Sequence, residues 1–128
     1  MEEVRAAWPQ HAGEHWEHLA RSAVPHLRVH GQRFRPPSRW WGRVRDGSDV
    51  ELDIVADAVA GNDVLVAEAK RTCSPREARS VLADLSRRAS RVPALEGRPI
   101  KTALFVMRQR GAGIPSVIGA AEVVDVLR

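Results

Sequence analysis

The sequence predicts an α/β domain in which helices flank a mixed central sheet. Three observations predict it: an amphipathic helical segment near the start, three strand-like runs in the middle, and a capped helix followed by another strand. The 128 residues suit one domain with a modest core, so we expect a single domain over residues 1–128. The expected element order is αβββαβ, followed by a small final element.

The first helix is expected over residues 13–27. Its apolar residues recur at helical spacing: Trp16, Leu19, Ala20, Ala23, Val24 and Leu27. Pro25 lies inside this pattern. Because proline removes a helical hydrogen bond, we expect a break near Val24.

Three strand-like runs follow and predict an antiparallel meander. They cover residues 39–44, 50–56 and 64–70. Asp46-Gly47 lies between the first two and Gly61-Asn62 between the last two. Such turn dipeptides join neighbouring antiparallel strands, so the middle run should lie between the other two.

A second helix begins with the capping box Ser74-Pro75-Arg76-Glu77. Its apolar residues fall on one face, and the helix should end before Pro93: Ala78, Val81, Leu82, Leu85, Ala89 and Val92. Residues 101–107 predict a fourth strand and residues 111–113 a glycine loop. Residues 117–127 predict a short final strand or helix.

Composition narrows the class of protein. No apolar run approaches the roughly 20 residues of a membrane span, so no membrane partner is expected. Cys73 is the only cysteine, which excludes an internal disulfide and favours a reducing cytoplasm. The net charge of +4 is compatible with nucleic acid. A GC-rich genome, which favours arginine and alanine, explains that charge equally well.

The residues that carry chemistry are Asp53 in the second run and Glu68 and Lys70 in the third. Alternate residues of a strand share a face, so Glu68 and Lys70 should lie together. A hairpin between the two runs would place Asp53 beside Glu68. The same alternation puts three apolar residues on the opposite face of the second run: Leu52, Ile54 and Ala56.

Two neighbouring carboxylates predict a divalent-cation site, because Mg²⁺ prefers oxygen ligands. Such a cation polarises a phosphoryl group and lowers the pKa of bound water. Lys70 would stabilise negative charge on the phosphate. The pattern therefore predicts a phosphodiesterase that uses Mg²⁺ or Mn²⁺, with Asp53, Glu68 and Lys70 as catalytic residues. The alternative is a solvated ion pair of Glu68 and Lys70, worth under ~1 kcal/mol.

Several other side chains are candidates for binding nucleic acid. A backbone-binding groove is expected from four arginines: Arg43, Arg71, Arg87 and Arg88. A solvated helix face with acidic partners is equally expected for the last two. Trp40 and Trp41 are candidates for base stacking, although we expect at least one to pack in the core. A histidine stripe on the first helix is expected to face water: His11, His15 and His18.

These motifs resemble the PD-(D/E)xK nuclease superfamily, and more closely the nuclease-like C-terminal domain of archaeal-type AAA ATPases. The resemblance covers roughly residues 13–110, and its short motifs are specific through their order. They are Trp16-Glu17, Trp40-Trp41-Gly42 and residues 51–56, 66–70 and 82–89. Leu52 stands where the superfamily name has proline, and no phosphate loop of the type GxxxxGK[ST] is present.

The resemblance implies a restriction-endonuclease-like αβββαβ core and endonuclease activity on DNA. It implies that Asp53, Glu68 and Glu17 hold the metal and that Lys70 assists catalysis. Helical periodicity independently places Glu17 at the border of the apolar face of the first helix, from which an acid reaches the active face of the sheet; the alternative is a border residue that faces water. It also implies an ATPase domain or subunit as a partner and a homodimer as an oligomeric state. Two alternatives remain open: a catalytically silent DNA-binding domain, and a regulatory or protein-interaction domain associated with an ATPase.

Overall fold

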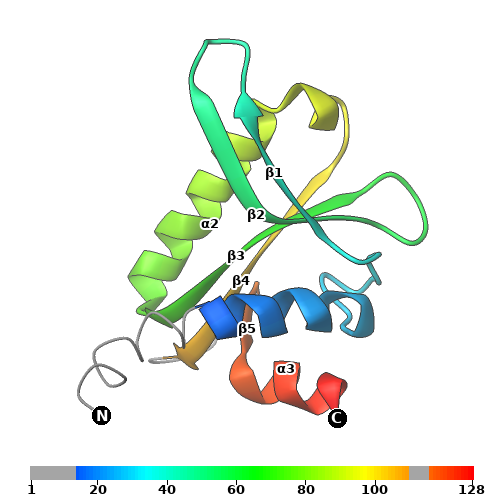
Figure 1. The fold of residues 1–128 in the computed structure, drawn as a ribbon, viewed down its shortest axis with the longest axis vertical. Helices are drawn as coiled ribbons and strands as arrows, with labels where there is room; N and C mark the ends of the chain where they lie inside the picture. Colours follow the sequence, from blue (N-terminus) through cyan, green and yellow to red (C-terminus); the bar gives the residue numbers. More distant parts are fainter. Residues whose placement is uncertain (1–13, 110–115) are drawn as a thin grey trace.

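The computed structural model describes residues 14–109 and 116–128, which form an α/β fold around a five-stranded mixed sheet (Figure 1). The strands lie in chain order, β1-β2-β3-β4-β5. The first three are antiparallel neighbours, and the last two add in parallel. The strands are β1 (Ser38–Arg43), β2 (Asp49–Asp57), β3 (Val64–Cys73), β4 (Ile100–Gln109) and β5 (Val117–Gly119). The predicted α/β class, meander and fourth strand are confirmed.

Helices precede and follow the meander as predicted. The first helix covers residues 14–23 of the described chain, and it gives way to the 3-10 turn η1 (Val24–His26) at Pro25. The break expected near Val24 is therefore confirmed. The remaining helical elements are α2 (Pro75–Ser90), the 3-10 turn η2 (Pro93–Leu95) and α3 (Ala120–Leu127). His11 and the glycine loop at residues 111–113 lie outside the described residues.

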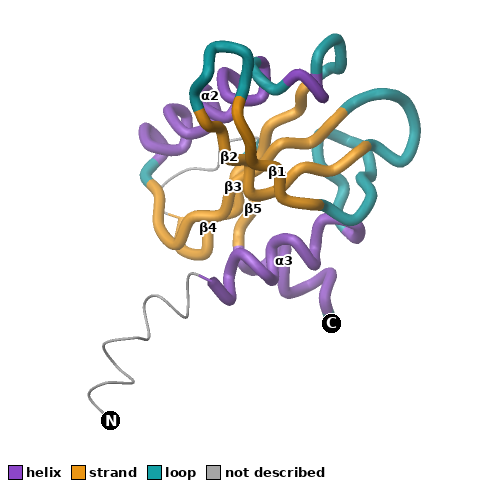
Figure 2. Tube along the Cα trace, turned by 45° about the horizontal axis from the view of Figure 1, so that its top comes forward, coloured by secondary structure: helices purple, strands orange, loops and turns teal. Residues whose placement is uncertain are grey.

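Apolar layers cover both faces of the sheet, which lies between α2 and the other two helices (Figure 2). In β3, Leu65 and Ala67 pack toward the first helix and α3. The alternate residues Val64 and Val66 pack toward α2. A central strand that is buried on both faces is typical of the parallel part of an α/β sheet. None of the described helices is long and apolar enough to cross a membrane.

Strand β2 departs from the simple alternation expected of it. Leu52 packs in the α2 layer, whereas Ile54 packs in the layer of the first helix. Between two flanking pairs, Asp53 and Ile54 together oppose Arg39 of β1, which is the two-against-one arrangement of a β-bulge. The flanking pairs are Ser38–Val55 and Trp40–Leu52. The prediction that Leu52, Ile54 and Ala56 share one face is wrong, because the extra residue shifts the alternation.

Helix α2 begins where its capping sequence predicts. Ser74 is the N-cap, and its hydroxyl accepts a hydrogen bond from the Glu77 backbone N–H at 3.2 Å. The helix buries residues of its expected apolar face: Ala78, Leu85 and Ala89. Strand β3 runs three residues beyond its predicted end and finishes at Cys73. Burial, followed by the charge of Glu77, raises the pKa of the Cys73 thiol.

Candidate acidic site

Asp53 lies half-buried at the bulge of β2. Its pKa is raised, first by burial and then by the negative charges of Glu17 and Glu51. The positive charges of Arg39 and Arg21 act in the opposite direction. A carboxylate that is desolvated beside other carboxylates is typical of functional sites, since a folded chain gains no stability from that arrangement alone.

Arg21 connects Glu17 of the first helix with the backbone of β2. Its Nη2 donates to the Glu17 Oε1 at 2.6 Å and to the Asp53 carbonyl oxygen at 3.0 Å. Its Nε donates to the same carbonyl at 3.2 Å. Arg39 of β1 reaches the same Glu17 oxygen at 3.0 Å. Two arginines therefore hold Glu17 on the side of the sheet to which Asp53 is exposed.

Glu68 and Lys70 lie against α2. Glu68 lies two residues beyond Val66 in β3 and therefore on the same face, which α2 covers. Its Oε2 is 3.8 Å from Arg88 Nη2. Glu68 and exposed Lys70 line one hollow with residues of α2: Ser80, Val81, Asp84, Arg87 and Arg88. The predicted sharing of a face by Glu68 and Lys70 thus agrees with the structure.

Ile54 and Ala67 form the end pair of the β2–β3 ladder. Asp53 comes directly before Ile54, and Glu68 comes directly after Ala67. The hairpin predicted between their strands is present. The bulge nevertheless exposes the Asp53 carboxyl to the charges of the first helix and β1, while Glu68 contacts α2. Within the described residues, Glu68 is not among the charges that shift the pKa of Asp53.

Glu17 and Asp53 fit the chemistry of a divalent-cation site. Their negative charges repel each other at a half-buried position, and a hard cation takes carboxylate oxygens as ligands. Glu68 does not join them: across residues 14–109 and 116–128, no three His, Cys, Asp or Glu side chains gather where they would hold one metal ion. The structure therefore brings together two members of the predicted ligand set and leaves the third at α2.

The candidate arginines divide into two kinds. Arg88 is a structural residue, because its Nε bonds Asp84 at 2.9 Å and its Nη1 bonds the Glu51 carbonyl oxygen at 2.7 Å. Arg87 is 71% exposed, and its contact with Asp84 is a loose 3.6 Å. Arg43 is also exposed, on the edge strand, 3.8 Å from Asp49. Arg71 is exposed on β3.

The sequence reasoning did not assign a role to Arg21 or Arg39. Arg21 follows Glu17 by four residues on a helix, a spacing that favours an ion pair, so a local signal existed. Arg39 reaches Glu17 from a different element, and no local pattern links the two. Trp40 packs partly in the α2 layer whereas Trp41 is 76% exposed, so core packing of one tryptophan is confirmed. His15 and His18 are exposed, as predicted.

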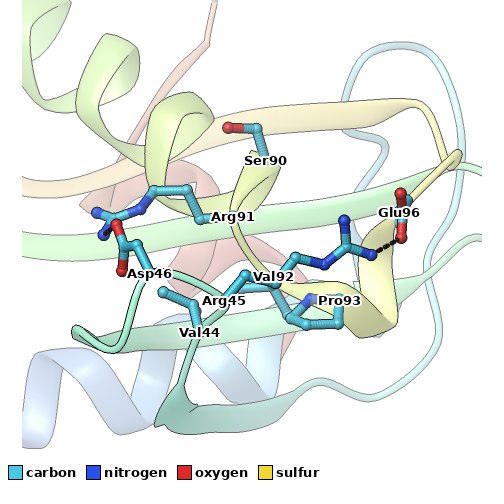
Figure 3. A pocket seen from close by; sticks show the side chains of 8 residues that line it. All are labelled: Val44, Arg45, Asp46, Ser90, Arg91, Val92, Pro93 and Glu96. Carbon is cyan, nitrogen blue, oxygen red and sulfur yellow. Dashed lines mark hydrogen bonds and ion pairs between the residues drawn. The ribbon is translucent and has the colours of Figure 1, made fainter.

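A separate hollow of about 220 Å³ lies where the β1–β2 hairpin meets the end of α2 (Figure 3). Arg45 of the hairpin pairs with Glu96, and Asp46 pairs with Arg91 across it. The Ser48 backbone N–H also donates to Asp46 at 2.9 Å. None of the D…ExK residues lines this hollow. We interpret it as the place where ion pairs dock the hairpin onto α2.

Asp46 makes the acid stability of this docking testable. Hydrogen bonds from Ser48, followed by Arg91, lower the pKa of Asp46 to about 2. A lowered carboxyl pKa adds stability that is present above the ordinary aspartate value of about 4 and is lost as the pH falls toward about 2. Asp46→Asn should therefore lower the urea midpoint at about pH 6 and lower it much less near pH 2, where the carboxyl is partly protonated in the folded state.

The matched control is Asp49→Asn on the same hairpin, where the pair with Arg43 is long and exposed. This control should change the midpoint little at either pH. An equal loss in both variants would show that the hairpin responds to charge in general and not to the contacts of Asp46.

Comparison with known proteins gives one family. Residues 1–81 match the profile of DUF234, described as archaea bacterial proteins of unknown function. No match was found among curated proteins or among solved structures. The matched segment spans the first helix and β1 to β3, with Glu17, Asp53, Glu68 and Lys70, and it covers more than half of the 128 residues. The chain therefore belongs to the DUF234 family.

Proposed function

We propose that the chain is a nuclease that hydrolyses DNA phosphodiester bonds with Mg²⁺ or Mn²⁺. The observation that carries the proposal is Asp53, whose pKa is raised at a β-bulge beside Glu17. Bulges are frequent next to active sites, where they redirect a side chain. The order of helix, three antiparallel strands, helix and parallel strand also agrees with the order implied by the resemblance to PD-(D/E)xK nucleases.

Each residue has a distinct role in this proposal. Glu17 and Asp53 hold the cation, which when bound polarises a phosphoryl oxygen and lowers the pKa of a water molecule. Arg21 fixes Glu17 relative to the β2 backbone through its three hydrogen bonds. Lys70 offers an ammonium group to the phosphate from the end of β3. Glu68 lies on the same face of β3 as Lys70 and contacts Arg88, and its part as a metal ligand stays a prediction.

A second candidate is a catalytically silent DNA-binding domain. It is favoured by the ion pairs at the acids: Glu17 accepts from two arginines, and Glu68 contacts Arg88. Arginines that neutralise these acids would lower their repulsion of a phosphate, so that no metal ion is needed for DNA to bind. In this reading the acids organise the arginines, and no bond is cleaved.

One experiment separates the two functions. Plasmid, linear and branched DNA are incubated with the protein in Mg²⁺, in Mn²⁺ and in EDTA, and binding is measured in parallel by fluorescence anisotropy. We expect cuts in at least one metal and none in EDTA. Binding without cuts in either metal would replace the nuclease with the silent reader. Neither binding nor cleavage of any substrate would contradict both and favour a protein-interaction domain.

A further inference from the structure

We propose that the hollow between the end of β3 and α2 binds a backbone phosphate of nucleic acid through Lys70, Ser80 and Arg87. Neither Glu17 nor Asp53 lines this hollow. In this inference Lys70 binds DNA on the α2 side of β3 whether or not it also assists cleavage. The inference rests on the proposed function only in taking nucleic acid as the ligand, since binding needs no cleavage.

The charges lining the hollow favour an anion. The guanidinium of Arg88 is occupied by contacts within the protein: with Asp84 at 2.9 Å, with the Glu51 carbonyl oxygen at 2.7 Å and with Glu68 at 3.8 Å. Both acidic residues of the hollow, Glu68 and Asp84, are thus already in contact with Arg88, which is 24% exposed. The hollow carries three cationic side chains against two carboxylates, a net positive charge. Asp84 is 49% exposed, but its carboxylate already accepts a hydrogen bond from Arg88, whereas Lys70 and Arg87 are exposed cations.

Lys70 and Arg87 are available for a ligand. Lys70 is exposed and makes no hydrogen bond or ion pair with any residue that the structure describes. The only ion pair of Arg87 within that part of the chain is the 3.6 Å contact with Asp84, at 71% exposure, and such a pair is weak in water. Ser80, exposed on the same rim, adds a hydroxyl donor of the kind that contacts phosphate oxygens.

The surface beyond the hollow continues the positive charge. Arg76 and Arg79 recur with Arg87 at helical spacing on the side of α2 away from the sheet, and all three are exposed. The small residues Ser80 and Ala83 lie on this stripe with them, so nothing bulky separates the cations. A stripe of guanidinium groups that leads to a lysine in a hollow suits a polymer of phosphates better than a single small anion.

The test measures binding of labelled duplex DNA in EDTA, where no cleavage interferes, over a series of salt concentrations. Each lost phosphate contact should reduce the slope of log affinity against log salt by about one. We expect this reduction in Lys70→Ala and in Arg87→Ala, and a reduction of about two in the double variant. Because the contacts are with the backbone, two duplexes of unrelated sequence should respond alike.

The chain offers matched controls of the same residue types. Lys101, the only other lysine, lies at the start of β4 and pairs with Leu65, whereas Lys70 pairs with Val106 near the other end. Arg45 has the same 71% exposure as Arg87 but lies on the β1–β2 hairpin. Lys101→Ala and Arg45→Ala should keep the parental slope.

Two results would overturn the subsite: an unchanged slope in both hollow variants, or equal reductions in the controls. Circular dichroism and thermal melting of every variant establish that the fold is kept, which is expected because both side chains are exposed. Failure of the nuclease proposal would appear differently: the parent protein would bind DNA, the salt slope would fall in the Lys70 and Arg87 variants as expected, and no DNA would be cut in Mg²⁺ or Mn²⁺.

Discussion

Replacing Trp16 with alanine should destabilise the fold by about 3–5 kcal/mol. Trp16 is 3% exposed in the apolar layer between the first helix and the sheet. Its indole Nε1 also donates to the carbonyl oxygen of Phe105 in β4 at 3.2 Å, a contact that spans 89 residues of sequence. The variant loses both the packing and this buried bond. Since a domain of this kind is stabilised by about 5–15 kcal/mol, the loss should be visible as a large fall in the urea midpoint.

The chain supplies a control of the same residue type. Trp41 is 76% exposed on β1, so Trp41→Ala should change stability by no more than about 0.5 kcal/mol. Trp16→Phe keeps most of the packing and loses the indole N–H, so it should fall between the two. A Trp16→Ala variant that is as stable as Trp41→Ala would contradict the docking of the first helix, and with it the position of Glu17.

The elements of the fold were predictable because their signals are local. The capping sequence at Ser74 fixes the start of α2, and Pro25 fixes the end of the first helix. Turn dipeptides and apolar runs place the three strands of the meander. Helical periodicity alone also predicts that Trp16 lies on the buried face. Sequence therefore carries the order of elements and most of the buried positions.

The bulge at Asp53 could not be predicted, because it depends on how β1 pairs with β2. The burial of β2 alternates regularly through Val50, Leu52, Ile54 and Ala56, so the strand itself carries no sign of an irregularity. The buried residues nevertheless enter two different layers. A one-residue change in register moves side chains to the other face of a sheet. Here it places Asp53 among the charges of the first helix and β1.

The site was predictable in its residues and not in its grouping. D…ExK spacing predicts Asp53, Glu68 and Lys70 as site residues, and the position of Glu17 at the border of the apolar face of the first helix, together with the resemblance, predicts that acid. Their partners belong to elements that meet only in the folded chain: Arg39 reaches Glu17 from β1, and Arg88 reaches Glu68 from α2. Long arginine side chains that cross between elements leave no periodic trace in a sequence.

Asp53→Asn should abolish cleavage and at the same time stabilise the fold at neutral pH. The amide keeps the shape of the side chain but is a poorer ligand for a hard cation. Loss of a direct ligand should lower metal-dependent cleavage at least about 100-fold, because second-shell changes alone cost 10–100-fold. Replacing a residue that serves the ligand and not the fold commonly adds stability while removing function.

The stability effect follows from the sign of the pKa shift. The pKa of Asp53 is raised, by burial first and then by Glu17 and Glu51. The folded state therefore disfavours the ionised carboxylate, and this cost grows as the pH rises from the ordinary aspartate pKa of about 4 through the raised value. Asn has no such cost. Because the site is only half-buried and solvent screens its charges, the gain at neutral pH should stay below about 1 kcal/mol.

Urea unfolding of the parent and of Asp53→Asn at about pH 7 and about pH 3 measures this directly, since the gain should vanish at the lower pH, where Asp53 is protonated in both states. Asp125→Asn, at an exposed position of α3, is the control and should change neither stability nor cleavage. A destabilised Asp53→Asn at neutral pH would mean that Arg21 and Arg39 more than offset the burial and the neighbouring acids. In that case the carboxylate is part of an arginine-paired structure, and the silent DNA-binding domain becomes the better account of the site.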